Sequence, residues 1–295
     1  MKLNPVSSQP DSSAIAVYSQ CSQMHEQIRL WRSKQEKIAL VPTMGHLHEG
    51  HVSLIELARQ KATRTVVSIY INPLQFNIED DFKHYPRSLE NDLKILNDLK
   101  VDAVFNPEDK ELYPKGHQLA PLIKIPELGK EFCGQYRPGH FDGVCTVVAK
   151  LFNIVSPHVA IFGKKDYQQL LIIQRMVADL NFDLEIIAGE TRRDNDGLAL
   201  SSRNTHLSTQ ERAIAPALNN SLKRVKDNFT PTNISQQEVT AINQLESTGL
   251  KVEYLGIRDA QDLQPINNST KNVVVLAAVW LGKTRLIDNI LFPLG

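Results

Sequence analysis

The sequence predicts an α/β protein with a doubly wound parallel sheet in its N-terminal part and a smaller α+β domain after it. Short, unbroken apolar runs, which are typical of strands buried on both faces of a parallel sheet, alternate with segments of helical periodicity up to about residue 190. The pattern then changes to helices followed by longer strands. A length of 295 residues with 42% hydrophobic content is sufficient for two cores.

Five segments are expected to form the parallel sheet: residues 37–43, 65–71, 101–107, 158–163 and 184–190. Three further segments repeat apolar residues at i, i+3, i+4 and i+7, as crossover helices on the faces of a sheet do: residues 51–62, 88–100 and 166–180. The first domain is therefore predicted over residues 15–190.

The second domain, predicted over residues 191–295 as a lid, has a clear starting signal. Ser208 and Glu211 match a capping box, in which each side chain satisfies a free amide at the start of a helix. Two helices and two strands are expected there: residues 209–228, 235–247, 251–259 and 272–282. The "GKT" that follows lacks the earlier glycine of a Walker loop, because residue 277 is Ala, so we predict a hairpin turn into "RLIDNI".

Composition excludes several classes of protein. Lysine plus arginine and aspartate plus glutamate number 33 each, so no net charge favours nucleic acid or an anionic membrane, and we expect neither as a partner. The three scattered cysteines, Cys21, Cys133 and Cys145, fit a reducing compartment, the cytoplasm, and not a disulfide framework. Residues 1–14 are polar without the apolar core of a signal peptide, so we expect a flexible tail.

The turn after the first strand, "PTMGHLHEGH", has the features of an anion site. Ligands of open parallel sheets bind beyond the carboxyl ends of the strands. Gly45 and Gly50 let the backbone turn tightly and approach a ligand, and a helix starting near His51 presents free amides and a positive dipole end. The lysine of a Walker loop is missing, but His48 and His51 share one face and can donate to phosphate oxygens, whereas His46 should point elsewhere.

Two other interpretations of this turn remain. The "HEGH" string resembles the zinc metalloprotease motif, but its histidines are three residues apart and not four, and a glycine intervenes, so we disfavour zinc. Alternatively, the histidines only cap the helix.

The turn after the second strand, "INPLQF", carries Asn72 and Gln75. Side-chain amides both donate and accept hydrogen bonds, which suits the hydroxyls and carbonyl of a small organic acid.

Two later turns add charge and hydroxyls. In "FGKKDYQQ", Lys165 is a mobile cation for phosphate and Asp166 an acceptor for ribose hydroxyls, although a capping aspartate beside solvated lysines has the same pattern. In "LALSSRN", Ser201, Ser202 and Arg203 provide two hydroxyls and a guanidinium for a phosphate chain. Each turn alone is compatible with ordinary loop chemistry, but their combination predicts one nucleotide site.

The chain resembles the pantothenate synthetase (pantoate–β-alanine ligase) family over nearly its whole length after about residue 15. The resemblance rests on strings in the family's order: "PTMGHLHEGH", "NPLQF", "YPRS", "RPGHFDGV", "FGKKDYQQL" and "DGLALSSRN". It implies a Rossmann-like fold of the nucleotidyltransferase type. The first and last strings also look like the His-Ile-Gly-His and Lys-Met-Ser-Lys-Ser motifs of class I aminoacyl-tRNA synthetases, with which only the adenylation chemistry is shared.

The resemblance implies an ATP-dependent ligase of pantothenate and coenzyme A biosynthesis. It would condense pantoate with β-alanine through a pantoyl-adenylate intermediate and release AMP and pyrophosphate, with Mg²⁺ on the nucleotide. A cytoplasmic homodimer is implied as well.

The same resemblance assigns roles to residues. His48, His51, Lys165 and Arg203 would be catalytic, and His51 matches the position of the family's proton donor. The ATP site would comprise Met44, Gly45, His46, Leu47, His48, Glu49, Gly50, His51, Gly163, Lys164, Lys165, Asp166, Arg192, Leu200, Ser201, Ser202 and Arg203. Gln75 and Gln169 would bind pantoate or β-alanine, with the dimethyl group of pantoate on Phe76 and residues 143–148. No residue is assigned to a metal.

Some positions depart from the family's pattern or lack a firm role. Cys133 stands where some members carry Glu, and a nucleophilic pair with His140 is disfavoured because adenylation already activates the acyl group. Arg192 occupies a position that is often Val, where contact with adenine would be through the backbone. Tyr85 and Arg137 lie, like His140, on segments that border the site in the family.

Two rival functions remain open. A nucleotidyltransferase that moves AMP or CMP onto a phosphate or alcohol would use the same histidine loop, but a phosphorylated acceptor would need a further cation near the second turn. A nucleotide-binding regulatory module would use the site without chemistry.

Overall fold

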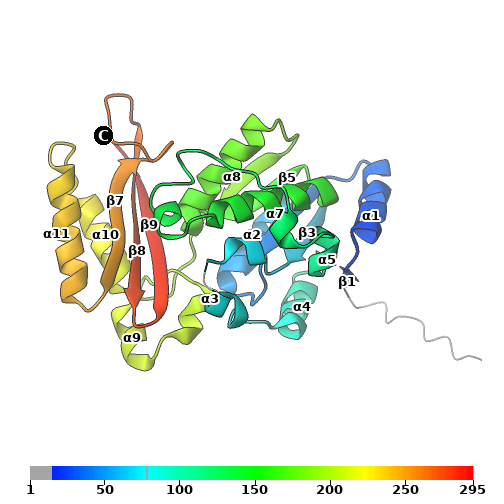
Figure 1. Ribbon diagram of the computed structural model, residues 1–295, viewed down its shortest axis with the longest axis horizontal. Helices are drawn as coiled ribbons and strands as arrows, with labels where there is room; N and C mark the ends of the chain where they lie inside the picture. The colour runs from blue at the N-terminus through cyan, green and yellow to red at the C-terminus, as the bar shows by residue number, and fades with distance from the viewer. Residues whose placement is uncertain (1–14, 78, 295) are drawn as a thin grey trace, which may run out of the picture.

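The computed structural model describes residues 15–77 and 79–294, and the predicted flexible tail lies outside these residues. Two sheets organise the chain and lie next to each other (Figure 1). One has six strands, all parallel, and the other has three antiparallel strands, drawn in orange and red at the left of Figure 1.

The parallel sheet has the strand order β1-β4-β3-β2-β5-β6. Its strands are β1 (Ala16–Tyr18), β2 (Ile38–Thr43), β3 (Arg64–Ile69), β4 (Ala103–Phe105), β5 (Val159–Gly163) and β6 (Glu185–Gly189). From β2 the chain adds β3 and β4 on one side, then crosses to add β5 and β6 on the other. The carboxyl ends of β2 and β5 therefore border the crevice in which open α/β sheets bind ligands. The five predicted strands are confirmed, and β1, with three residues, was too short to show a pattern.

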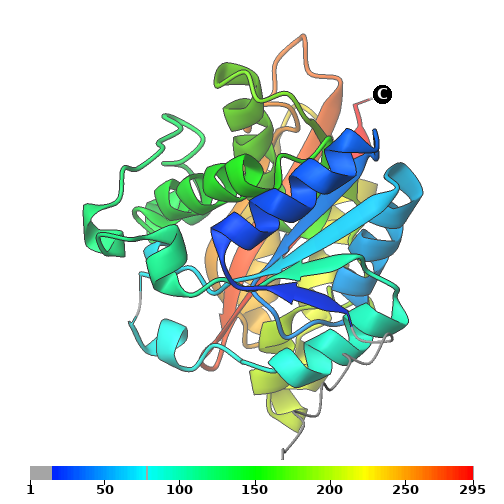
Figure 2. The ribbon, with the colours of Figure 1, turned by 90° about the vertical axis from the view of Figure 1, so that its right-hand side faces the viewer.

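Helices cover both faces of this sheet (Figures 1 and 2). One face carries α1 (Cys21–Ser33), α7 (His140–Val155) and α8 (Tyr167–Asp179), and the other carries α2 (Glu49–Lys61) and α4 (Leu89–Asp98). Successive residues of β2 alternate between the two cores, with Ile38 and Leu40 in the first and Ala39 and Val41 in the second. The doubly wound prediction is confirmed.

Helix α7 was not predicted, because 13 of its 16 residues are buried and an apolar helix shows no polar face in the sequence. Its Gly143 allows close packing: a Cβ there would lie 2.3 Å from the carbonyl oxygen of Leu74. The short helix η1 (Pro73–Gln75), which carries Gln75, therefore rests directly on α7.

The remaining elements before the second sheet are short: α3 (Glu79–Lys83), α5 (Asp109–Leu112), η2 (His117–Leu119), α6 (Cys133–Tyr136), η3 (Lys164–Asp166) and η4 (Ser202–His206).

The antiparallel sheet is layered between its own helices and the first unit. Its elements are α9 (Thr209–Ile214), α10 (Ala217–Asp227), α11 (Ile234–Ser247), β7 (Lys251–Asp259), β8 (Asn272–Leu281) and β9 (Thr284–Pro293). Along β8, Val273 and Val275 join the core beneath α10 and α11, whereas Val274 and Leu276 join the core of the parallel sheet. The sheet thus fixes the two units against each other.

The helix predicted over residues 235–247 and the strands predicted over 251–259 and 272–282 are confirmed as α11, β7 and β8. Two local signals were also correct, and one predicted helix was wrong. Ser208 and Glu211 form the capping box, and Leu281 pairs with Thr284 across a tight hairpin in which Gly282 has φ +58°. The helix predicted over residues 209–228 is instead split into α9 and α10, because Pro216 has no amide to donate within a helix.

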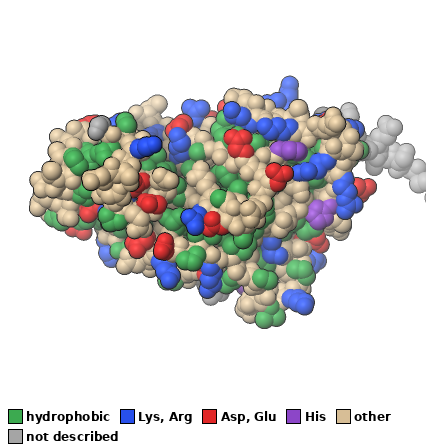
Figure 3. Space-filling model, turned by 90° about the horizontal axis from the view of Figure 1, so that it is seen from above, with side chains coloured by type: hydrophobic (Ala, Val, Ile, Leu, Met, Phe, Trp, Pro, Cys, Tyr) green, Lys and Arg blue, Asp and Glu red, His purple; other side chains and the backbone are tan. Residues whose placement is uncertain are grey.

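On the face shown in Figure 3, acidic and basic side chains are interspersed, as the balanced composition suggests. None of the described helices is both long and apolar enough to cross a membrane. The predicted boundary between residues 190 and 191 falls just after β6, and the role of the second unit as a lid stays a prediction.

Candidate functional site

A cavity of about 220 Å³ lies at the carboxyl ends of the parallel strands. Its walls include residues from all four turns that the sequence singled out, after β2, β3, β5 and β6. His48, His51, Lys165 and Arg203 all line this one cavity.

The two cavity histidines cap helix α2 and also face the cavity. His48 is the N-cap, and its Nδ1 accepts a hydrogen bond from the Gly50 amide at 3.1 Å. The His48 amide in turn donates to Nδ1 of His51 at 3.3 Å, and the two rings lie 4.1 Å apart. The capping interpretation is therefore correct as local structure, and the helix begins at Glu49, two residues earlier than predicted.

Burial and nearby charges keep both rings neutral, and the hydrogen bonds at Nδ1 determine which ring nitrogen carries the hydrogen. Burial lowers the pKa of His48 to about 4, and the nearby charge of Lys165 contributes in the same direction. Burial and then His48 lower the pKa of His51 to about 3. Both rings are therefore neutral at pH 7, and because each Nδ1 accepts from a backbone amide, the hydrogen lies on Nε2. The site contains two neutral imidazole donors.

Gly50 has a different role from the one expected. It lies inside the first turn of α2, and a Cβ there would be 2.8 Å from Cε1 of His48. The glycine therefore makes room for the His48 ring to fold back onto its own helix, and the tight turn is made by Gly45 (φ +80°) and His46 (φ +52°).

A buried carboxylate that the sequence reasoning missed holds this turn in place. Asp92 on α4 is 1% exposed and accepts hydrogen bonds from the amides of His46 and Leu47, both at 2.8 Å. Its only sequence signal is its position, four residues before the buried Leu96 and so on the buried face of an amphipathic helix. Asp92 thereby sets the path of the chain into His48.

The amide of Gln75 lines the cavity with its orientation fixed by neighbours. Its Nε2 donates to Sδ of Met44 at 3.0 Å, and its Oε1 accepts from Asn72 at 3.3 Å. Asn72 itself is 1% exposed, bonded to the Gly143 carbonyl and the Tyr113 hydroxyl. The prediction that Asn72 contacts a ligand is therefore wrong: it supports Gln75.

The apolar part of the cavity lining comes mainly from α7. Val144, Val147 and Val148 line the cavity, as predicted for residues 143–148, and Gln169 of α8 lies beside them. Phe76 is not in the lining and packs edge-on against Phe82 and Tyr85 instead, with ring centroids 5.3 and 5.7 Å apart. The predicted contact of Phe76 with a substrate is thus corrected.

Lys165 enters the cavity from the short helix η3. Its side chain is 20% exposed, and its Nζ lies 3.8 Å from the Asp166 carboxylate. The neighbouring Lys164 points away and pairs with Glu190. The two lysines of "FGKKD" therefore differ, and only Lys165 lines the cavity.

The turn after β6 supplies hydroxyls and a guanidinium. Ser202 is buried and donates to the His46 carbonyl at 3.2 Å, which joins this turn to the histidine turn. Arg203 lies 5.4 Å above the ring of Tyr85 and pairs with Asp81 at 3.0 Å. Tyr85 and Asp81 thus hold the guanidinium of Arg203 at the cavity.

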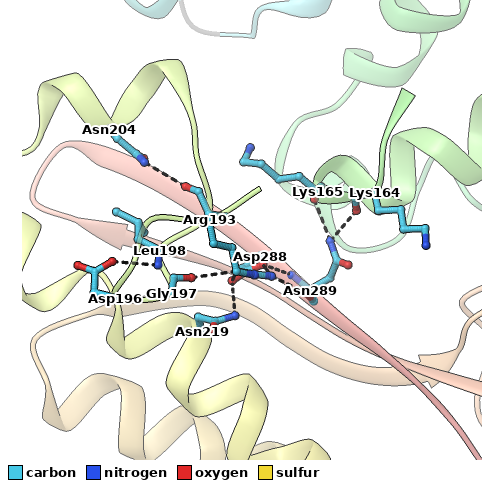
Figure 4. Close-up of polar contacts among 11 residues, drawn as sticks. Lys164, Lys165, Arg193, Asp196, Gly197, Leu198, Asn204, Asn219, Asp288 and Asn289 are labelled. Atoms are coloured by element: carbon cyan, nitrogen blue, oxygen red, sulfur yellow. Dashed lines mark hydrogen bonds and ion pairs between the residues drawn. The ribbon is translucent and has the colours of Figure 1, made fainter. Parts of the chain in front are cut away.

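Residues 192–200 form a small hairpin that leads into this turn. The Leu200 amide donates to the Arg192 carbonyl, and Arg193 pairs with Ala199 as an antiparallel bridge. The side chain of Arg192 is exposed, which is consistent with a backbone role at that position. Arg193 reaches back to Asp288 on β9 (Figure 4).

A second cavity of about 820 Å³ lies between the two units and adjoins the first at Lys165, Asp166, Ser201 and Arg203. It is also lined by Arg137, for which no acidic partner is found among the described residues. Burial lowers the pKa of Arg137, and the charges of Arg203 and Arg285 act in the same direction.

Cys133 is buried, 3.6 Å from Nη2 of Arg285. His140 contacts Arg137 and the Gln75 carbonyl, so its ring is engaged away from Cys133.

Most of the predicted site residues meet in the first cavity. Those in the lining are Met44, His48, Gly50, His51, Gln75, Gly163, Lys165, Asp166, Gln169, Arg192, Leu200, Ser201, Ser202 and Arg203. Those outside the lining are Gly45, His46, Leu47, Glu49 and Lys164. For these five, contact with a ligand stays a prediction. The amides of His46 and Leu47 bond to Asp92, Glu49 is exposed, and Lys164 pairs with Glu190, which itself lines the cavity.

Comparison with known proteins gives one consistent result. The sequence profile of the family described as "Pantoate-beta-alanine ligase" matches residues 16–291. The chain is 48% identical over 269 residues to the pantoate–β-alanine ligase of Schizosaccharomyces pombe, covering 90% of this chain and 95% of that protein. It is 49% identical over 266 residues to the pantothenate synthetase of Chromobacterium violaceum, covering 90% and 96%.

Solved structures agree. The pantothenate synthetase of Thermus thermophilus superposes with a TM-score of 0.85 at 37% identity, covering 94% of this chain and 99% of that one. The pantoate–β-alanine ligase of Francisella tularensis, solved with "Beta-gamma ATP" and β-alanine, has a TM-score of 0.78 at 37% identity, covering 94% and 98%. Because the family match and the relatives extend over nearly the whole chain, this protein belongs to the pantoate–β-alanine ligase (pantothenate synthetase) family and is a ligase.

Proposed function

We propose that this enzyme condenses pantoate with β-alanine at the expense of ATP, through a pantoyl-adenylate intermediate, and releases AMP and pyrophosphate. The observation that carries the proposal is the convergence of His48, His51, Lys165 and Arg203 on a single cavity beside Gln75. The names of the relatives, and the "Beta-gamma ATP" and β-alanine in the complex of the Francisella tularensis protein, support the choice of substrates.

Adenylation is the step that this donor set serves. A carboxylate is a poor acyl donor because its leaving group would be oxide, so its attack on the α-phosphorus of ATP first forms a mixed anhydride. Negative charge then moves onto the departing pyrophosphate. Donors fixed at those oxygens stabilise the transition state more than the ground state.

The donors differ in kind. Lys165 and Arg203 supply full positive charge, whereas His48 and His51 supply neutral Nε2–H groups. The backbone contacts at each Nδ1 orient these donors before the substrate arrives, which reduces the reorganisation needed during the reaction. The resemblance gives His51 the position of the family's proton donor, and its neutral Nε2–H can donate a hydrogen bond to the oxygen of the departing pyrophosphate without a change in the charge of the ring.

Pantoate would occupy the first cavity, beside the apolar residues of α7. Its hydroxyls and carboxylate would contact the amides of Gln75 and Gln169, and its dimethyl group would pack on Val144 and Val147.

β-Alanine would occupy the second cavity, between the two units. Its carboxylate suits Arg137, a partly buried cation without a paired acid among the described residues, and this position lies near the junction of the two cavities at Lys165. From there the amine can attack the acyl carbon and displace AMP.

Magnesium would arrive with ATP. Within the described part of the chain, no group of three or more His, Cys, Asp or Glu side chains is arranged for a metal. Mg²⁺ is commonly held by substrate phosphates, water and one or two carboxylates. The substrate phosphates and water would hold the ion, which would neutralise phosphate charge during the attack, and Asp166 in the cavity lining keeps its proposed role as acceptor for the ribose hydroxyls.

The decisive experiment mixes the purified enzyme with ATP, Mg²⁺ and pantoate, without β-alanine, and measures pyrophosphate. We expect release that requires pantoate, followed by AMP and pantothenate when β-alanine is added. Release that ignores pantoate would favour the nucleotidyltransferase alternative. ATP binding without any release would favour a regulatory module. A cytoplasmic location and a homodimer stay predictions, as does the absence of a nucleic-acid partner.

A further inference from the structure

Two adjacent residues of β9, Asp288 and Asn289, are not among the residues proposed to contact ATP or pantoate. Between them they bond to the turn after β5, which carries Lys165, and to the turn after β6, which leads to Arg203 (Figure 4). Both are nearly buried, with 3% and 5% exposure. β9 belongs to the antiparallel sheet, far along the chain from the turns that it contacts, so the connection is made only by the fold.

Asp288 is the centre of the contact with the turn after β6. Its two oxygens accept from Arg193 at 2.6 and 2.8 Å, a bidentate pair, and its Oδ2 also accepts from Asn219 at 3.0 Å. Arg193 further donates to the Gly197 carbonyl at 3.1 Å, within the hairpin of residues 192–200. Ser201 directly follows this hairpin, so the position of Arg193 governs where the hydroxyls and Arg203 enter the cavity.

Asn289 makes the contact with the turn after β5. Its Nδ2 donates to the carbonyl oxygens of Lys164 and Lys165, both at 2.9 Å. These are the backbone oxygens of η3, from which the Lys165 side chain extends into the cavity. The backbone amide of Asn289 also donates to the Asp288 carboxylate at 2.7 Å, which links the two contacts.

We propose that Asp288 and Asn289 are positioning residues for adenylation, which hold the Lys165 turn and the Ser201–Arg203 turn at a fixed separation around the triphosphate. This inference rests on the proposed function for the chemistry that it assists. Neither side chain needs to touch substrate. Because catalysis by fixed donors depends steeply on geometry, a displacement of about 1 Å in Lys165 reduces the rate on the order of a hundredfold.

The test is Asn289→Asp, which keeps the shape of the side chain but places a carboxylate oxygen against two carbonyl oxygens. We expect kcat for pyrophosphate release to fall about tenfold or more, while KM for pantoate, whose proposed contacts lie elsewhere, stays within about twofold. Asn289→Ala, which removes the donor without adding charge, should act in the same direction and serves if the first variant folds poorly.

A double-mutant cycle separates positioning from a general structural role. If Asn289 acts through Lys165, then Asn289→Asp has almost no further effect in a Lys165→Ala background. An equal loss in both backgrounds, or an unchanged kcat, would overturn the proposal.

Asn228→Asp is the matched control, because Asn228 also donates its side-chain amide to a carbonyl, that of Arg224 at 2.8 Å, but lies exposed at the end of α10. It should leave kcat and KM unchanged.

If the wild-type enzyme releases no pyrophosphate with pantoate, the proposed function fails. The double-mutant cycle of Asn289→Asp and Lys165→Ala is then repeated with the Kd for ATP, measured by calorimetry, as its readout. Weaker ATP binding by Asn289→Asp only when Lys165 is present would still support the positioning role, and equal weakening would oppose it.

Discussion

At the residue scale, His48 and His51 are neutral imidazoles, and the Nε2–H of each ring is the proposed hydrogen-bond donor. Burial lowers the pKa of both His48 and His51 far below 7, so neither can replace a lysine as a resting cation. What they offer is direction: each ring is fixed by a backbone amide at Nδ1 and presents Nε2–H toward the cavity. The loop thus carries imidazoles as oriented hydrogen-bond donors.

Replacing His51 with Ala tests this assignment. We expect the fold to remain intact and pyrophosphate release to slow by about a hundredfold, because the loss of one preorganised donor typically costs about 3 kcal/mol of transition-state stabilisation. The measurement is the single-turnover rate of adenylate formation, with circular dichroism as the check on folding.

His117→Ala provides the control for that experiment, because His117 is a half-buried imidazole on η2, outside the cavity lining. It should leave the rate unchanged. A His51→Ala rate within a factor of about ten of the wild type would remove His51 from the donor set.

At the element scale, the site depends on helices that contribute no ligand. α4 supplies Asp92 to the amides of His46 and Leu47, and α7 supplies the side-chain-free Gly143 on which η1 rests. Without the first contact the histidine turn loses its anchor, and without the second Gln75 moves away from the cavity. Contacts with α4 and α7 thus fix the positions of two turns that line the cavity.

Asp92→Asn should reduce both stability and activity. An amide can accept from one of the two backbone amides, but its NH₂ group then faces the other, which leaves a buried donor unpaired at a cost of about 1–3 kcal/mol. Urea denaturation and the rate of pyrophosphate release measure the two effects.

Asp98→Asn is the comparison, since Asp98 lies on the same helix but is exposed. It should change the free energy of unfolding by less than about 0.5 kcal/mol. If Asp92→Asn behaves like Asp98→Asn, the anchoring role of Asp92 is wrong.

At the scale of the whole molecule, stability and site chemistry are linked through buried neutral histidines. Burial lowers the pKa of His140 to about 3, as it does for His51, and holds that of His48 at about 4. In an unfolded chain the pKa of histidine is about 6.5. Below that pH the unfolded state therefore binds protons that the folded state does not.

The free energy of unfolding should consequently fall as the pH decreases from about 6.5 toward 4. Above about pH 7 these histidines are neutral in both states, so they no longer make the free energy of unfolding depend on pH. Between about pH 6.5 and 4, each of them adds at most about 1.4 kcal/mol per pH unit to the slope. Urea denaturation of the wild type and of His140→Gln between about pH 5 and 6 checks this, and the variant should show the shallower slope. Identical slopes would contradict the buried neutral state of His140.

The sequence was sufficient for five strands of the parallel sheet, for the helices α2, α4 and α8, and for the four turns that form the cavity, because apolar periodicity and turn chemistry are local signals. It did not reveal α7, whose apolar surface has no polar face, or the break at Pro216. It also assigned Asn72 and Phe76 to a substrate, whereas the structure places both against protein neighbours.

The sequence by itself determined the fold class and the chemical groups of the site, since these depend on residue type and spacing along one segment. Only the tertiary structure decided which neighbouring lysine enters the cavity, that the imidazoles are neutral, and that Asp92, Asp288 and Asn289 hold the turns from distant elements. The physical reason is that burial, pKa and side-chain direction depend on what packs nearby, and residues bonded to each other at the site are separated in the chain by up to 156 positions.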